Sequence, residues 1–112
     1  MKHLIYICLF AMTSLGMTIP DSGVGVVEFN ASFNSANSVD WIDELSDCKG
    51  KRVDILANPE LQKEHKIVVV PTVIVFNDGE EVERFQANIM MQLEATKDEV
   101  QEAVDEIIMS AF

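Results

Sequence analysis

The order of apolar and polar positions divides the chain into alternating strands and helices. Residues 24–31 form an apolar run rich in valine, which predicts a buried strand. Within residues 38–46, apolar side chains recur on one face of a helix, so we expect a helix there. These apolar positions are Val39, Ile42 and Leu45. Residues 52–56 predict a second strand.

The second half of the chain carries clearer boundary signals. Asn58 and Pro59 supply an N-cap residue and a proline at the first helical position, which predicts a short helix over residues 59–65. Residues 72–76 and 81–86 have the composition of strands, and the Asn-Asp-Gly-Glu segment between them predicts a hairpin turn. The last two strands are therefore expected to be antiparallel.

A C-terminal amphipathic helix is the clearest single element. Thr96 and Glu99 have the spacing of a capping box, which places the start of this helix. Apolar residues then recur at helical spacing at Val100, Ala103, Val104, Ile107, Ile108 and Ala111. Acidic residues occupy the opposite side, so one face of the helix is expected to be buried.

The first 18 residues have the pattern of a secretory signal peptide. A basic start is followed by a short apolar run over residues 4–10 and then by small and polar residues. We therefore divide the chain into a signal peptide, residues 1–18, and one domain, residues 19–112, exported to the periplasm or the extracellular space. The alternative is that residues 4–10 form a first strand, in which case the protein is cytoplasmic.

Length and charge limit the partners. A chain of 112 residues has room for one compact domain. With 19 acidic and 8 basic residues its formal net charge is -11, so its surface repels phosphate backbones, and we expect no nucleic-acid partner. After residues 1–18 no apolar run is long enough to span a membrane, so we expect no insertion.

Taken together, the elements and motifs resemble the thioredoxin family over residues 26–112. Residues 27–33 match the family's apolar strand, buried acid (Glu28) and aromatic residue before the active loop (Phe33), and Val70-Pro71-Thr72 matches its cis-proline loop. The resemblance implies an α/β, thioredoxin-like fold. Its features are a central mixed β-sheet flanked by helices, a cis-proline loop and a C-terminal amphipathic helix.

The chain departs from the family at the redox centre. The Cys-x-x-Cys motif of the family falls on Asn34-Ser35-Ala36-Asn37, and an amide cannot replace a thiolate. We therefore expect a redox-inactive domain without an enzymatic thiol pair at this loop. Glu28, the family's buried acid, is left without cysteines to serve. Its pKa should be raised by burial, and it is interpreted as a relic or as bonded to a polar neighbour.

Other candidate chemistry is sparse. If residues 1–18 are removed, Cys8 leaves with them, and Cys48 is the single thiol of the mature chain. Cys48 is then either a small buried hydrophobe or a reactive thiol. His65 has no histidine or cysteine at metal-ligand spacing, so no metal and no cofactor is expected. Met90 and Met91 are interpreted as gap-filling side chains, with the alternative that a partly exposed pair would suit a protein contact.

The binding half of the family's mechanism can survive without thiols. By resemblance, Val69, Val70, Pro71 and Thr72 would offer backbone and apolar surface to an extended protein or peptide partner, with Phe33 beside them. Asn34 and Asn37 would add amide hydrogen bonds or cap the following helix. In the plainer interpretation, Pro71 only shapes its loop and Phe33 is core. Two other functions stay open, a thiol-disulfide protein acting through Cys48 and an accessory subunit of an envelope complex.

Overall fold

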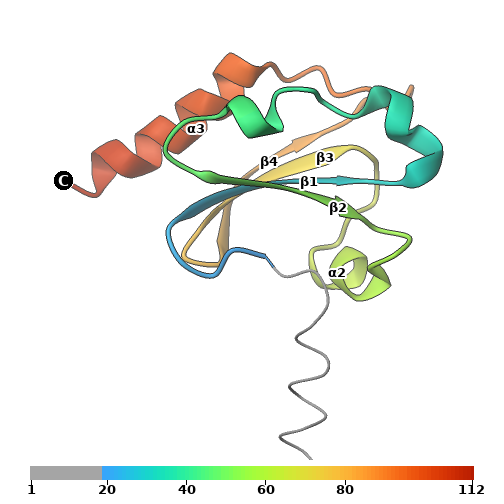
Figure 1. The fold of residues 1–112 in the computed structure, drawn as a ribbon, viewed down its shortest axis with the longest axis horizontal. Helices are drawn as coiled ribbons and strands as arrows, with labels where there is room; N and C mark the ends of the chain where they lie inside the picture. The colour runs from blue at the N-terminus through green and yellow to red at the C-terminus, as the bar shows by residue number, and fades with distance from the viewer. Residues whose placement is uncertain (1–18) are drawn as a thin grey trace, which may run out of the picture.

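The computed structural model describes residues 19–112, so the predicted signal peptide and Cys8 lie outside the described residues. Four strands form one sheet in the order β2-β1-β3-β4. They are β1 (Val24–Asn30), β2 (Lys49–Asp54), β3 (Thr72–Asn77) and β4 (Glu80–Gln86). β1 runs parallel to β2 and antiparallel to β3, and β3 runs antiparallel to β4 (Figure 1). The predicted mixed sheet is confirmed.

β1 is one of the two central strands of the sheet, with β2 on one side and β3 on the other. Residues 25–30 are all buried, and their side chains alternate between the two faces of the sheet. On one face the core contains Val27 and Phe29, and helix α2 (Pro59–Glu64) covers it. On the other face Val26 packs beneath helix α3 (Lys97–Ser110) and the segment before β2 (Figure 1).

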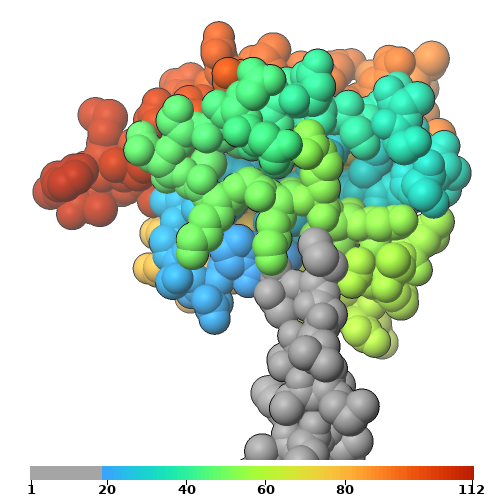
Figure 2. All heavy atoms as spheres, viewed as in Figure 1, coloured from blue at the N-terminus to red at the C-terminus, as the bar shows by residue number. Residues whose placement is uncertain are grey.

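The capping box of α3 is confirmed. The Thr96 hydroxyl accepts a hydrogen bond from the Glu99 backbone N–H at 3.3 Å, and the Glu99 carboxylate accepts one from the Thr96 N–H at 3.2 Å. Val100, Ala103 and Val104 are buried against the sheet, while the C-terminal turn extends beyond the rest of the body (Figure 2). Among residues 19–112, no helix is long and apolar enough to cross a membrane.

The predicted helix over residues 38–46 is wrong. Within that range only one short 3-10 helix forms, η2 (Ile42–Glu44), and another, η1 (Ser32–Asn37), ends just before the range; the residues between them form an irregular connection. The apolar residues of this segment are three positions apart, and three residues make one turn of a 3-10 helix. Ile42 is buried and Val39 and Leu45 pack beside it, so short turns bury the same side chains that a helix would have buried.

Strand β2 begins and ends earlier than predicted, at Lys49–Asp54 in place of residues 52–56. The start of β2 lies close to η2. A Cβ atom added at Gly50 would lie only 2.7 Å from the Ile42 carbonyl oxygen. Glycine is the residue that permits this approach. Ile55 and Leu56 then fall outside the strand, which leaves Leu56 exposed.

The other predicted elements are present. The hairpin between β3 and β4 turns at Asp78 and Gly79, whose φ angles of 50° and 84° suit a two-residue hairpin loop. α2 starts with Pro59 at its first turn as expected, but Asn58 does not cap it with its side chain. The Asn58 amide donates to the Asp54 carbonyl oxygen instead, at 3.0 Å.

Candidate functional site

Four connecting segments meet at one edge of the sheet. β1 and β2 are parallel, so η1 and the segment after Asp54 leave the sheet at the same edge. Thr72 at the start of β3 pairs with Phe29 near the end of β1 and with Gln86 at the end of β4. The cis-proline loop before β3 and the turn after β4 therefore reach that edge too (Figure 1).

An apolar groove of about 380 Å³ lies among these segments. Phe33 from η1, Leu56 after β2, Val68 before the proline and Ile89 after β4 contribute exposed side chains to it. Phe33 is 68% exposed and Val68 is 79% exposed, and Ile89 is fully exposed. Large apolar side chains held outward around one groove are typical of a surface that binds another molecule.

The backbone of the cis-proline loop forms the groove wall. The Val70–Pro71 peptide bond is cis, as the resemblance implies. The Thr72 hydroxyl donates to the Val69 carbonyl oxygen at 2.7 Å, and the Ala87 N–H donates to the Pro71 carbonyl oxygen at 3.1 Å. Val69 and Val70 line the groove, whereas Pro71 and Thr72 are buried behind them.

Asn34 is buried, and every polar atom of its side chain has a partner. Its Nδ2 lies 3.1 Å from Asn30 Oδ1, 3.1 Å from the Met91 carbonyl oxygen and 3.4 Å from the Val70 carbonyl oxygen. Its Oδ1 accepts a hydrogen bond of 2.8 Å from Asn37 Nδ2. The two asparagines thus bond to each other. The expectation that they cap a following helix is wrong, since the helix is not formed.

Asn30 anchors this network from the end of β1. Its Nδ2 donates to the Asn34 carbonyl oxygen at 3.1 Å and to Ser38 Oγ at 2.8 Å. Asn30 and Asn34 are both at least nine-tenths buried. Buried amides are stable only when they are hydrogen-bonded, so the loop is held in one arrangement.

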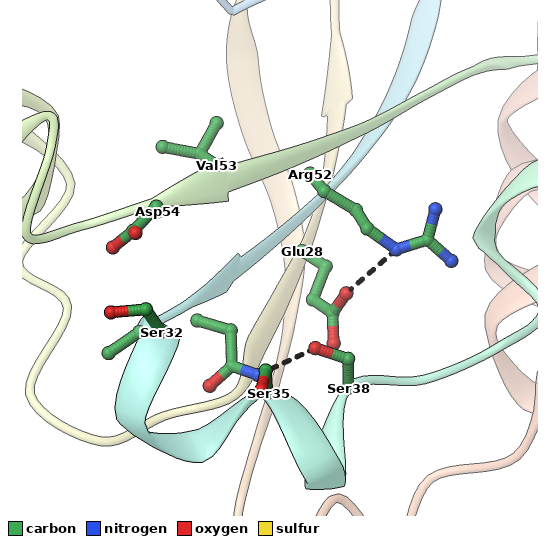
Figure 3. Close-up of a pocket in the computed structure, with 9 residues that line it drawn as sticks. Glu28, Ser32, Ser35, Ser38, Arg52, Val53 and Asp54 are labelled. Carbon is green, nitrogen blue, oxygen red and sulfur yellow. Dashed lines mark hydrogen bonds and ion pairs between the residues drawn. The ribbon is translucent and has the colours of Figure 1, made fainter.

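Glu28 lies at the bottom of a second, polar pocket of about 250 Å³ (Figure 3). Its Oε2 accepts a hydrogen bond of 2.8 Å from the Val39 N–H, and its Oε1 lies 3.3 Å from Arg52 Nε. The second contact has the distance of an ion pair without the alignment of a hydrogen bond, so Oε1 is left without a hydrogen-bond partner. Ser32, Ser35 and Ser38 line the rim of the pocket.

The pKa of Glu28 is raised above its ordinary value. Burial of the carboxyl group is the largest cause, and the Val39 N–H and the Arg52 guanidinium act in the opposite direction. The buried acid with a raised pKa that the sequence predicts is therefore present. Its polar neighbours are Val39 N–H and Arg52, and no thiol lies among the residues that line its pocket.

Cys48 lies far from the groove in the fold. It precedes the amino end of β2, whereas the groove forms at the carboxyl ends of β1 and β2. The side chain is partly buried against the α3 side of the core. Burial raises the pKa of the Cys48 thiol, and the nearby carboxylates of Asp47 and Asp105 raise it further. The thiol is therefore protonated at neutral pH, which makes it a poor nucleophile.

The structure brings together most of the residues selected from the sequence. Phe33, Val69 and Val70 line the groove, Asn34 and Asn37 support it, and the interpretation of Phe33 as core is wrong. Ser35 lines the neighbouring polar pocket, and Ala36 is exposed in η1. The interpretation of the two methionines as gap-fillers is also wrong, because Met90 is 66% and Met91 41% exposed.

Several groove residues do not follow from the sequence pattern, among them the exposed Leu56, Val68 and Ile89. Leu56 was assigned to a strand, and Val68 and Ile89 lie in segments without a periodic pattern. The run of apolar residues after Asn88, outside any predicted element, is the sequence feature from which an exposed apolar surface could have been predicted.

Similarity to proteins of known structure identifies the fold. No protein-family model and no curated protein sequence matches the chain. A single-residue variant of thioredoxin from Halobacterium salinarum NRC-1 superposes with a TM-score of 0.61 and 23% identity over 77% of this chain and 75% of that one. Thioredoxin from Schistosoma mansoni superposes with a TM-score of 0.60 and 20% identity over 77% of this chain and 78% of that one. A designed protein superposes with a TM-score of 0.60 and 21% identity over 79% of this chain and 83% of that one. The chain therefore has a thioredoxin-like fold.

Proposed function

We propose that this chain is a redox-inactive, thioredoxin-like binding domain that holds an extended protein or peptide segment in the groove beside Pro71. The observation that carries the proposal is the ring of exposed apolar side chains around that groove. Exposed apolar patches of this kind mark sites of protein association. The partner segment supplies apolar side chains to the groove, and basic side chains in it favour association because the formal net charge of the chain is -11.

The loop chemistry supports binding over catalysis. The positions that correspond to the two cysteines carry Asn34 and Asn37, and amide side chains cannot form a mixed disulfide. The thiol of Cys48 is protonated and lies at the other end of β2. A bound segment therefore associates and dissociates without a covalent step.

A titration followed by NMR tests the proposal. The 15N-labelled protein is mixed with an eight-residue peptide of alternating valine and lysine, and separately with one of alternating serine and lysine. Both peptides carry the same charge, so only the apolar side chains differ. We expect the valine peptide to shift the amide signals of Phe33, Val68, Val69 and Ile89. Shifts confined to α3 or to the Glu28 pocket, or equal shifts with both peptides, would contradict the proposal.

We also infer that the domain acts after export. The basic start, the apolar run over residues 4–10 and the small residues that follow support this inference. The N-terminal sequence of the protein isolated from its native cells tests it. A start between Gly16 and Ile19 is expected, and a chain that retains residues 1–18 would overturn the inference.

A further inference from the structure

We propose that Asn34 is a positioning residue that fixes the width of the apolar groove by tying its loops together. Asn34 belongs to η1, and its amide reaches the carbonyl oxygens of Val70 in the cis-proline loop and Met91 in the turn after β4. Val70 lies 36 positions and Met91 lies 57 positions after Asn34 in the chain. The effect on peptide affinity rests on the proposed function, whereas the effect on the loops does not.

The orientation of the Asn34 amide is set from both ends. Asn37 donates to its oxygen, and Asn30 accepts from its nitrogen while donating to the Asn34 carbonyl oxygen. With its oxygen occupied, the side chain directs its two N–H groups at three acceptors, Asn30 Oδ1 and the two loop carbonyl oxygens, so two of these acceptors share one N–H. Because Asn34 is buried, water cannot readily replace these hydrogen bonds.

The turn held by this contact is itself well ordered. The Asn88 side-chain oxygen accepts hydrogen bonds from the backbone N–H groups of Met90 and Gln92, and the Asn88 carbonyl oxygen accepts one from Met91 N–H. Met91 has a φ of 58°, in the left-handed region. This compact turn carries Ile89 and Met90 outward at the groove rim. Apolar side chains on a rigid turn bind with little further loss of conformational entropy.

Removing the amide should therefore loosen one wall of the groove. In Asn34→Ala we expect amide hydrogen exchange of Met90, Met91 and Gln92 to become about tenfold faster, which is the effect of losing one or two buried hydrogen bonds. We expect the valine-lysine peptide to bind about tenfold more weakly. The matched control is Asn58→Ala, which removes a side-chain amide that donates to a backbone carbonyl outside the groove lining. It should change neither quantity by more than about twofold.

The exchange measurement decides the inference even if no peptide binds, because it concerns only the loops. Unchanged exchange of the turn in Asn34→Ala would overturn it, and so would equal acceleration in Asn58→Ala. If Asn34→Ala does not fold, wild type gives the answer. The two Nδ2 protons of Asn34 should exchange as slowly as the amides of the turn, and exchange at the rate of a free asparagine side chain would overturn the inference.

Discussion

The side-chain amide of Asn37 donates a 2.8 Å hydrogen bond to the side-chain oxygen of Asn34. These are the two positions on which the Cys-x-x-Cys motif of the thioredoxin family falls. A hydrogen bond between the side chains thus lies where a disulfide would lie. It holds η1 together and aims the Asn34 amide at the groove loops, but it offers no electrons to a substrate.

Restoring both cysteines tests this geometry. In Asn34→Cys/Asn37→Cys, made in a Cys8→Ser/Cys48→Ala background, we expect an intramolecular disulfide to form with oxidised glutathione, because the two native side chains already touch. The intact mass of the variant should fall by two hydrogens when the disulfide forms. The Cys8→Ser/Cys48→Ala protein without the two new cysteines should not catalyse the reduction of insulin by a dithiol donor. Failure to form the disulfide would show that the two positions do not face each other.

Glu28 should make stability depend on pH. Burial raises its pKa above the value of 4.5 for an ordinary glutamate, so the folded state disfavours the charged carboxylate. The neutral Glu28 side chain contributes to the stability of the folded state. This contribution is fully present below the pKa that Glu28 has in the unfolded chain, and it is lost as pH rises through the higher pKa that it has in the folded protein. We therefore expect the melting temperature of wild type to fall relative to Glu28→Gln between about pH 3.5 and pH 7, a range that starts about one unit below the ordinary carboxyl value of 4.5.

The comparison with glutamine at position 28 cancels the other carboxylates, since both proteins share them. The ion pair with Arg52 forms only with the charged carboxylate, so its contribution is already part of the pKa of Glu28 and acts against the effect of burial. A wild type that gains stability relative to Glu28→Gln over this range would mean that the Arg52 contact outweighs burial.

Cys48 should react slowly. Burial and two carboxylates raise its pKa, so little thiolate is present at neutral pH. We expect a disulfide reagent such as DTNB to modify it at least about tenfold faster in urea than in the folded protein. The difference between wild type and Cys48→Ala isolates its signal from that of Cys8. Rapid modification in the folded state would reopen the hypothesis of a reactive Cys48.

The capping box of α3 should contribute measurably to stability. Thr96→Ala removes the acceptor for the Glu99 N–H and should cost about 1 kcal/mol, which lowers the melting temperature by about 4–8 °C in a domain of this size. Met109→Ala, an exposed change on the same helix, is the control and should stay within about 0.5 kcal/mol. Equal effects of the two changes would contradict a role for the cap.

The sequence predicts β1, the β3–β4 hairpin and α3 well because their signals are local. β1 is an apolar run, the hairpin has Asp78-Gly79 at its turn, and α3 begins at its capping box. The segment between β1 and β2 has no such signal. Apolar residues spaced by three suit one face of an α-helix or a 3-10 helix, and packing against α3 and the sheet decides between them.

The groove could be predicted only in part for a related reason. Phe33 and Val70 lie beside motifs that resemble a known family, so their position follows from the chain order. Leu56 and Ile89 come from separate connections that meet only when the sheet forms. The bond between Asn34 and Met91 likewise joins residues that no sequence pattern relates.

The most direct test of the groove compares two valine substitutions. Val68→Asp places a charge in the groove, whereas Val82→Asp places the same charge on an exposed part of β4 outside the groove lining. Fluorescence anisotropy with a labelled valine-lysine peptide measures the dissociation constant, and thermal melting shows that both variants are folded. We expect binding to be at least about tenfold weaker in Val68→Asp and unchanged within about twofold in Val82→Asp. Equal losses in the two variants, or no binding by wild type, would contradict the proposed role of the groove.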